Sequence, residues 1–449
     1  MGTRVVKECC QTKQSSSYLN ITSDLGHSFE YQDDESILIN PVSYKDDSNT
    51  KKACVEFGSN YIRLSAAMPL EVPVSFNFEC PKPINILGND ILFVLELSDA
   101  TVEWLEVMKA ALIGVVQMVG PNDRIGILGF NNRVIKLSGL VAGDVSGKLK
   151  LERVIRDMKA EGSADLLEAV RLALYLLKGR LFVNNNASVI LFSVTPDEFP
   201  ESAMERAEHC FTEYKDLEYS INGFGLGDFH NSELLNYISL SGVYTYIPHP
   251  VSFNKHLTSV FPSILTGKIH NLALSLSVSS LLPVEISKIF QHPSSLDYGS
   301  TLNIIFLMNF AIVNENAKDR VHINAKISHK FDCFECSGSI DVYGPAWNIE
   351  EILPDEGVMI DFFKEKTVQN LLMAMDKEFN VAVKIVEGTI FEGKMSSVGN
   401  CEKMTQFLRK IENLKENLVT VGRWTEEIKA VIYSFIRRLW GKSLKNFDN

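Results

Sequence analysis

Oxygen-bearing side chains follow a strongly apolar stretch near residue 95, in a pattern that delivers metal ligands to the edge of a sheet. The stretch reads ILFVLELSDAT at residues 91–101, with Glu96, Ser98 and Asp99 at its end. A Mg²⁺ site needs six hard oxygen ligands in near-octahedral order, so carboxylates and hydroxyls are the required groups. Ala100, however, stands where the pattern D-x-S-x-S has its second hydroxyl. The sequence therefore leaves open whether this strand end holds a metal.

Two other candidates for chemistry are weaker. Cys333 and Cys336 form a single C-x-x-C pair with His329 nearby, whereas zinc sites usually need a second pair or two histidines, so we expect free thiols. The glycines of 223–227 have no lysine or helix start behind them, so we expect them to end a strand rather than to bind a nucleotide. The G-x-S-x-G pattern of a serine hydrolase is absent. We therefore predict no catalytic residues and no enzymatic activity.

The composition of the chain limits which partners it can bind and where in the cell we expect it. The 449 residues carry a net charge of −12, which argues against nucleic acid, and no run reaches the ~18 apolar residues of a membrane span. The eight cysteines are too few and scattered for a disulfide scaffold, which favours reduced thiols and a cytoplasmic location. Gly2 invites a myristoylation motif, but Val6 stands where that motif has Ser or Thr.

The central part of the chain alternates apolar strands with amphipathic stretches. Continuous apolar runs predict strands buried on both faces, and a 3.6-residue period predicts the helices between them. This alternation predicts a mostly parallel sheet with helices on both faces, whose ligands bind beyond the carboxyl ends of the strands. The main expected strands are 90–97, 123–130, 187–194, 218–227 and 243–248, and the main expected helices are 101–119, 147–158, 165–180, 202–215, 233–242 and 252–265.

The flanking segments have a different character. Residues 1–50 are rich in Ser, Asp and Gln, and predict a disordered leader. Alternating patterns in 53–82 and 267–350 predict the strands of a β-sandwich, into which an α/β domain at 88–266 is inserted. Helices return over 357–442 and predict a subdomain that leans on the sandwich. We expect the last helix to pack on the β domain through its apolar stripe, formed by Trp424, Ile428, Ile432, Phe435 and Trp440.

The segments of the central domain occur in the order of a known fold. FVLELSDATVEWLEVMKAALIGVVQMVGPNDRIGILGF, EGSADLLEAVRLAL, ASVILFSVTPDEF and INGFGLGDFHNSELLNYISLSGVYTYI together resemble a von Willebrand factor type A domain. The phrases VGPNDRIGILGFNNRVIKLSGL and LLKGRLFVNNNASVILFS resemble the plant RING ubiquitin ligases of the wavy-growth type. The resemblance implies a von Willebrand A fold, which is Rossmann-like, with flanking strands and a helical tail.

In that family a divalent ion lies on the upper edge of the sheet, in a metal-ion-dependent adhesion site. Carried over by position, the ligands of the family would be Glu96 for an aspartate, Ser98 and Ala100 for two serines, Ala164 for a threonine and Val194 for an aspartate. Only Ser98 is unchanged, and alanine and valine offer no side-chain oxygen. The resemblance thus implies a degenerate site, with Glu96 and Ser98 as its only remaining candidate ligands.

Several oxygen donors lie one to three positions from the lost ligands, and a slip of either loop would bring them inward. We nevertheless expect no cofactor and no bound Mg²⁺, because loop slips rarely rebuild an octahedral site. We expect Ser98 and Asp165 to act as helix caps instead. The predicted partner-binding rim consists of Glu96, Ser98, Asp99, Ser163, Asp165, Thr195 and Asp197.

Two classes of function follow. The first is an intracellular, non-enzymatic module that binds another protein through the metal-free rim. The second is a component or regulator of a ubiquitin ligase, which binds substrates or pairs with RING-bearing relatives. A RING needs eight zinc ligands in C-x-x-C pairs, and the N-terminus offers only Cys9 and Cys10, so we expect no RING activity. Metal-dependent adhesion is a third, weaker alternative. The sequence leaves open whether the chain forms homo- or hetero-oligomers.

Overall fold

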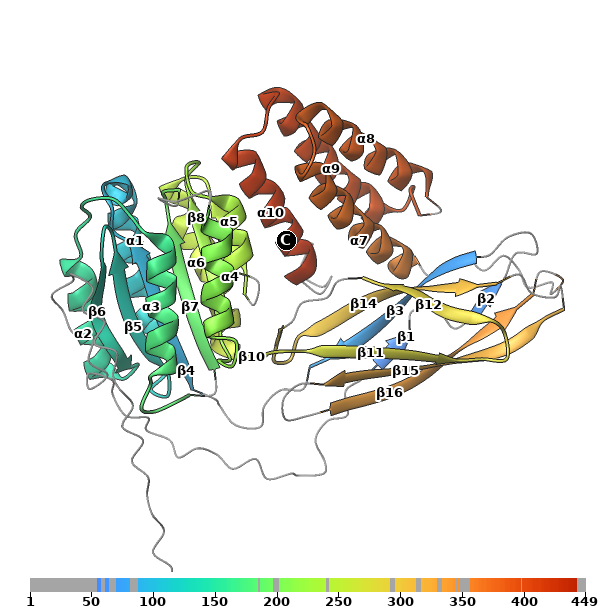
Figure 1. Ribbon diagram of the computed structural model, residues 1–449, viewed down its shortest axis with the longest axis horizontal. Helices are drawn as coiled ribbons and strands as arrows, with labels where there is room; N and C mark the ends of the chain where they lie inside the picture. The colour runs from blue at the N-terminus through green and yellow to red at the C-terminus, as the bar shows by residue number, and fades with distance from the viewer. Residues whose placement is uncertain are drawn as a thin grey trace, which may run out of the picture.

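The chain folds into three parts that lie side by side: an α/β domain, a β-sandwich and a group of four helices (Figure 1). This computed structural model describes most of the chain, but not the predicted leader at 1–50, which lies outside the described residues. The described residues are 55–57, 61–63, 70–80, 88–184, 186–196, 202–239, 242–290, 295–311, 316–328, 333–344, 346, 356–396 and 398–441.

The α/β domain contains a six-stranded sheet in the order β6-β5-β4-β7-β8-β9. All neighbouring pairs are parallel except β5 and β6, which are antiparallel. The central strands are buried along their whole length, as their continuous apolar runs predict. The strands are β4 (Asn89–Glu96), β5 (Arg124–Phe130), β6 (Val134–Ala142), β7 (Asn186–Ser193), β8 (Ser220–Leu226) and β9 (Tyr244–Ile247).

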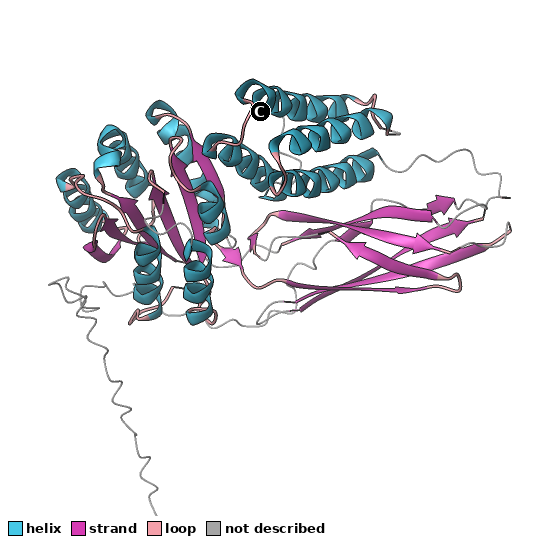
Figure 2. Ribbon diagram, turned by 45° about the horizontal axis from the view of Figure 1, so that its top comes forward, coloured by secondary structure: helices cyan, strands magenta, loops and turns pink. Residues whose placement is uncertain are grey.

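Helices cover both faces of this sheet (Figure 2). One apolar cluster joins the sheet to α1 (Val102–Met118), α2 (Val145–Asp157) and α6 (Phe253–Thr266). The cluster on the other face includes side chains of α3 (Leu166–Lys178), α4 (Ala203–Glu213) and α5 (Ser232–Ile238). The short helices η2 (Asp99–Thr101) and η4 (Pro250–Ser252) precede α1 and α6.

A buried carboxylate, that of Asp90, connects several elements at the amino ends of the parallel strands. Asp90 accepts hydrogen bonds from Arg124, Arg180 and both the backbone and side chain of Asn184. Both guanidinium groups are buried, so their charges are compensated inside the domain. This cluster fixes β4, β5 and the loop after α3 to one another.

The β-sandwich is formed by two four-stranded sheets, in the orders β1-β3-β14-β12 and β11-β15-β16-β2. Each sheet combines strands from before the α/β domain with strands from after it, so that domain is inserted between sandwich strands. The strands are β1 (Val55–Phe57), β2 (Tyr61–Arg63), β3 (Leu70–Glu79), β11 (Ala273–Ser279), β12 (Val284–Ile289), β14 (Thr301–Phe310), β15 (Lys318–Ser328) and β16 (Cys333–Tyr343). The small antiparallel pair β10 (Lys268–Ile269) and β13 (Leu296–Asp297) joins the segment after α6 to the segment between β12 and β14.

The four C-terminal helices contact both other parts. They are α7 (Glu356–Met375), α8 (Phe379–Met395), α9 (Glu402–Val421) and α10 (Glu426–Gly441). α7 contacts β3 and β14 of the sandwich, as expected for a subdomain leaning on it. The expectation that the last helix packs on the β domain is wrong: α10 packs on α5 and β9 of the α/β domain and on α7 and α9. Periodicity identified the buried face of α10 but could not identify what covers it.

Candidate functional site

The carboxylate of Glu96 lies at the carboxyl end of β4 and is completely buried. Its Oε1 accepts hydrogen bonds from Ser98 Oγ at 2.6 Å and Thr195 Oγ1 at 2.9 Å. Its Oε2 accepts from Ser193 Oγ at 3.0 Å, and from the backbone nitrogens of Val194 at 2.7 Å and Thr195 at 3.2 Å. Five donors of this chain therefore surround a charge that burial would otherwise destabilise.

The first loop is tied to the loop before α3. Asp99 is exposed, and its Oδ1 accepts a 3.1 Å hydrogen bond from the nitrogen of Gly162, while its own nitrogen donates to the Gly162 carbonyl at 2.9 Å. The nitrogen of Glu161 donates to the Leu97 carbonyl at 2.9 Å. Ser98 immediately precedes η2, but its hydroxyl makes no capping hydrogen bond and donates to Glu96 instead. The prediction that the Ser98 side chain caps a helix is therefore wrong.

Asp165 does cap a helix. Its side chain accepts from the nitrogen of Glu168 at the start of α3, and its Oδ1 lies 3.2 Å from Arg206 on α4. Ser163 is exposed two residues earlier. The structure thus brings Glu96, Ser98 and Thr195 into hydrogen-bonding contact, whereas Asp99 and Asp165 are engaged by other groups. Asp197 lies outside the described residues.

This donor set does not fit an octahedral Mg²⁺. The family positions corresponding to Ala100, Ala164 and Val194 carry no side-chain oxygen, and the last two are buried. Oε2 of Glu96 faces the backbone N–H groups of Val194 and Thr195, which have no lone pair to offer a cation, and the neighbouring hydroxyls of Ser98, Ser193 and Thr195 are too few to complete an octahedron. Among the described residues, no three His, Cys, Asp or Glu side chains are arranged to hold a metal ion.

A second polar cluster lies beside this edge, around His230 in the turn before α5. Its Nδ1 lies 2.8 Å from the Gly227 carbonyl and its Nε2 lies 2.7 Å from the Tyr244 hydroxyl. Burial lowers the pKa of His230 to about 4, so the ring is neutral at pH 7. His230 was not among the site residues predicted from the sequence, where the histidines are scattered over helices and loops. Glycine at position 225 leaves room for the ring, because an added Cβ there would lie 2.1 Å from His230 Nε2.

Apolar side chains are exposed at the same carboxyl edge. Val102 at the start of α1 is 62% exposed, Phe229 beside His230 is 78% exposed, and Val251 in η4 is 95% exposed. α1 contacts η4, and the nitrogen of Gly227 donates to the Ile247 carbonyl at the end of β9. These three residues, which we call the apolar rim, therefore follow β4, β8 and β9 at one edge of the sheet.

The remaining sequence candidates form no assembled site among the residues that the structure describes. Gly223 and Gly225 lie within β8, where an added Cβ at Gly223 would lie 2.4 Å from Ser239 Oγ, so these glycines admit close packing of α5. Cys333 is exposed, whereas His329 lies outside the described residues. None of the helices in the described part of the chain is long and apolar enough to cross a membrane.

Two polar contacts attach α10 to the α/β domain. Glu426 accepts from Ser232 Oγ at 2.8 Å, at the first residue of α5. Burial alone would raise the pKa of Glu426, but hydrogen bonds from Ser232 and Lys429 outweigh it and lower that pKa. Arg437 donates from Nε to Asn236 Oδ1 at 2.8 Å and from Nη2 to the Asn236 carbonyl at 2.7 Å. α5 thus links the helical part to the loop that carries Phe229.

Comparison with known proteins identifies the fold. No protein-family model and no curated protein sequence matches the chain. Among solved structures, a von Willebrand factor type A protein from Catenulispora acidiphila is 12% identical, with a TM-score of 0.59 over 88% of this chain and 99% of that protein. The ArnB paralog VWA2 from Sulfolobus acidocaldarius is 13% identical, with a TM-score of 0.51 over 86% of this chain and 97% of that protein. Since both likenesses extend well beyond the central domain, the predicted fold is confirmed: a von Willebrand A domain with its β-sandwich and C-terminal helices.

Proposed function

We propose that this protein is a non-enzymatic interaction module that binds another protein at the carboxyl edge of its von Willebrand A domain without a metal. The von Willebrand A fold itself suggests a role in protein interaction or adhesion. The observation that carries the metal-independent form is the saturation of Glu96 by five hydrogen bonds from Ser98, Ser193, Val194 and Thr195. These bonds hold the strand ends together, which a metal and its ligands would otherwise do.

The exposed surface above Glu96 suits a polypeptide partner. The apolar rim consists of Val102, Phe229 and Val251. Burial of these side chains against a partner would stabilise the complex by about 25 cal/mol per Å² of apolar surface. Asp99 and Glu103 are exposed beside Val102, so the favoured partner segment carries apolar side chains with basic residues next to them. Of the rim predicted from the sequence, Asp99 lies on this exposed surface, whereas Glu96 and Ser98 are buried beneath it.

A non-enzymatic role agrees with the surroundings of Glu96 and His230, two buried titratable groups at this edge. Both oxygens of Glu96 accept hydrogen bonds, and both ring nitrogens of His230 have partners within the domain. Both side chains are also fully buried, which keeps a substrate from reaching them. We place the protein in the cytoplasm, as the scattered cysteines of the sequence favour.

The test combines metal titration with affinity purification. Calorimetric titration of the full chain with Mg²⁺ and with Mn²⁺ should give no binding heat at submillimolar concentration. A tagged chain should capture the same partners in EDTA as in Mg²⁺, and the double variant Phe229→Ser/Val251→Ser should lose them. The matched control is Phe391→Ser on α8, a residue that is also exposed. Capture that requires Mg²⁺, or that survives the rim substitutions, would contradict the proposal.

A ubiquitin-ligase role is the second candidate, and the resemblance of the sequence to RING ligases of the wavy-growth type favours it. In that case the captured proteins include RING-bearing relatives or ubiquitin-conjugating enzymes, and their capture depends on the rim or on the flanking parts. Mass spectrometry of the purified material distinguishes the two candidates. If the captured proteins include no ubiquitin-pathway protein, the second candidate function is excluded and the first remains.

A further inference from the structure

The strand β11 forms an open edge of the sandwich. It is the terminal strand in the order β11-β15-β16-β2, and β15 is the only described strand that pairs with it. Its seven residues, ALSLSVS, pair with β15 in unbroken register and carry no charge and no proline. Such an edge presents a row of free backbone N–H and C=O groups to any strand that can approach it.

The other edges of the described sheets are protected in the ways that prevent such pairing. β12 carries Glu285 and Lys288 and has a register shift between Ile286 and Lys288. β6 carries Lys136 and two register shifts, and β9 is short and is contacted by α10. β1 and β2 have three residues each, and the part of β16 that β2 leaves uncovered carries Glu335. Since charges, bulges and short length protect edges, the exception of β11 points to a partner.

The hydrophobic core is incompletely covered beside this edge. Leu274, Leu276 and Val278 point inward from β11, yet they are only partly buried, and they pack against the sandwich core. Across the opening, Leu282, Val284 and Ile286 at the start of the other sheet's edge are also partly buried. A further strand beside β11 would cover both rows, and the buried apolar area would stabilise the contact.

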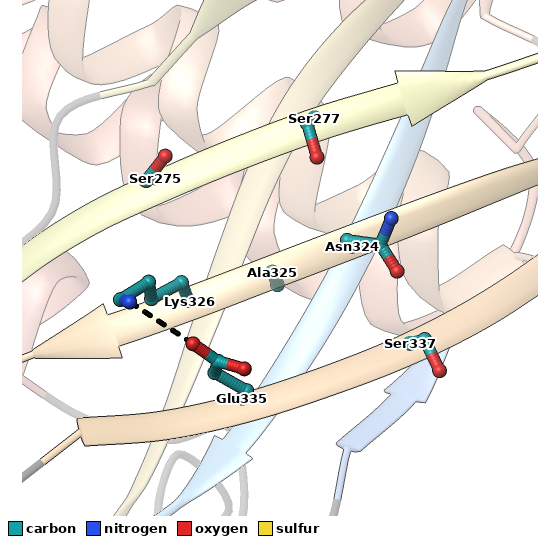
Figure 3. A pocket seen from close by; sticks show the side chains of 7 residues that line it. All are labelled: Ser275, Ser277, Asn324, Ala325, Lys326, Glu335 and Ser337. Atoms are coloured by element: carbon teal, nitrogen blue, oxygen red, sulfur yellow. Dashed lines mark ion pairs between the residues drawn. The ribbon is translucent and has the colours of Figure 1, made fainter.

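The outer face of β11 allows a strand to approach closely. Ser275 and Ser277 are small, and they line an open depression of about 390 Å³ together with Asn324, Lys326, Glu335 and Ser337 (Figure 3). The charges on this face are paired within the chain, because Lys326 Nζ lies 2.9 Å from Glu335 Oε1 on the next strand. No long or charged side chain of β11 itself stands in the way.

We propose that β11 is the surface on which a second copy of this chain binds, with the two β11 strands antiparallel about a twofold axis at Leu276. In that register Leu274 faces the other copy's Val278, and Ser275 faces the other copy's Ser277. The alternation of the strand is therefore self-complementary, which a twofold interface requires. A foreign strand is less favoured because β11 has no charge or bulky outward side chain that would select one sequence over another.

The test uses lysines on the outer face, which do not disturb the core. Sedimentation equilibrium of the full chain should give about twice the mass of the 50.3 kDa monomer. In Ser275→Lys/Ser277→Lys, each new lysine faces a lysine of the other copy, and opposed like charges destabilise a strand pair, so the dissociation constant should rise about tenfold or more. Mixing this variant with Ser275→Glu/Ser277→Glu should restore the dimer, because lysine then faces glutamate.

The matched control is Ser337→Lys/Ser339→Lys, two exposed serines of β16 in the same sheet, which should leave the dimer unchanged. Circular dichroism and thermal unfolding show that each variant is folded. A parent chain that stays monomeric at high micromolar concentration would overturn the proposal. The proposal would also be overturned if the lysine substitutions in β11 left the dimer unchanged. Dissociation only in the β16 variant would place the contact on the other edge of the sheet. None of these outcomes bears on the rim, so the two proposals are tested separately.

Discussion

The backbone nitrogen of Val194 donates a 2.7 Å hydrogen bond to Oε2 of Glu96. The bond joins the carboxyl ends of β4 and β7, the two central strands of the sheet. Val194 stands where the resemblance to von Willebrand A domains would place an acidic ligand, and its backbone serves the carboxylate of the first loop instead. The two loops are thus connected through a protein carboxylate and a protein amide.

Replacing Glu96 with glutamine should destabilise the α/β domain. Glutamine keeps the shape but removes the charge, and its Nε2 donor would face groups that are themselves donors. Hydrogen bonds to a buried charged group contribute about 1.5–3 kcal/mol, and an unsatisfied buried donor adds its own cost, so we expect a loss of about 3 kcal/mol in the free energy of unfolding. Urea denaturation of the two chains measures the difference.

Glu103→Gln is the matched control, because Glu103 is exposed on α1 seven residues further along. Its free energy of unfolding should stay within about 0.5 kcal/mol of the parent. Equal stability of the Glu96 and Glu103 variants would show that the five hydrogen bonds are not what holds this edge.

Chelation of divalent ions should not change stability. A ligand that binds only the folded chain stabilises it by about 2.7 kcal/mol at a hundred times its dissociation constant. Because the donors around Glu96 do not fit Mg²⁺, we expect the melting temperature in EDTA and in about 5 mM Mg²⁺ to agree within about 1 °C. Differential scanning fluorimetry measures this, and a rise of several degrees with Mg²⁺ would mean that a neighbouring loop supplies ligands.

The sequence allowed the order of buried strands and amphipathic helices to be predicted, because both depend on local periodicity. The helix cap at Asp165 was predictable for the same reason, since a cap acts within its own turn. The network around Glu96 was not, because its donors Ser193, Val194 and Thr195 lie about a hundred positions away, and only strand pairing brings them to it. The hydroxyl of Ser98 therefore bonds to a carboxylate rather than to the helix it precedes.

His230 should make stability depend on pH below neutrality. Burial lowers the pKa of His230 to about 4, below the 6.5 of an exposed imidazole. Above pH 6.5 His230 is neutral in both the folded and the unfolded chain, so it does not make the free energy of unfolding depend on pH. Between pH 6.5 and about 4 only the unfolded chain takes up the proton, so the free energy of unfolding falls as pH falls, by at most about 3 kcal/mol. Burial lowers the pKa of His270 to about 4 as well, which acts in the same window.

The measurement is urea denaturation at pH 7.5, 6.5, 5.5 and 4.5, for the parent, His230→Gln and His249→Gln. His249 is exposed and serves as the matched control. The His230 variant should be less stable at pH 7.5, because it alters a buried hydrogen-bonded group, but its stability should fall less steeply with acid. Parallel pH profiles for all three chains would mean that His230 takes up its proton equally in the folded and unfolded states.

Arg437→Met should loosen α10 from the α/β domain while keeping its apolar contacts. Burial lowers the pKa of Arg437 to about 10, which still leaves the guanidinium charged at pH 7, and its two hydrogen bonds to Asn236 satisfy part of that charge. Their removal should cost the contact about 2–3 kcal/mol. Hydrogen–deuterium exchange read by mass spectrometry should then be faster in α10 and α5 but unchanged in β15 and β16.

Arg423→Met, at an exposed arginine just before α10, is the matched control and should leave both helices protected. Because α5 follows the loop that carries Phe229, faster exchange in residues 227–239 would also mean that the helical part helps to fix the apolar rim, whereas faster exchange confined to α10 would separate the two.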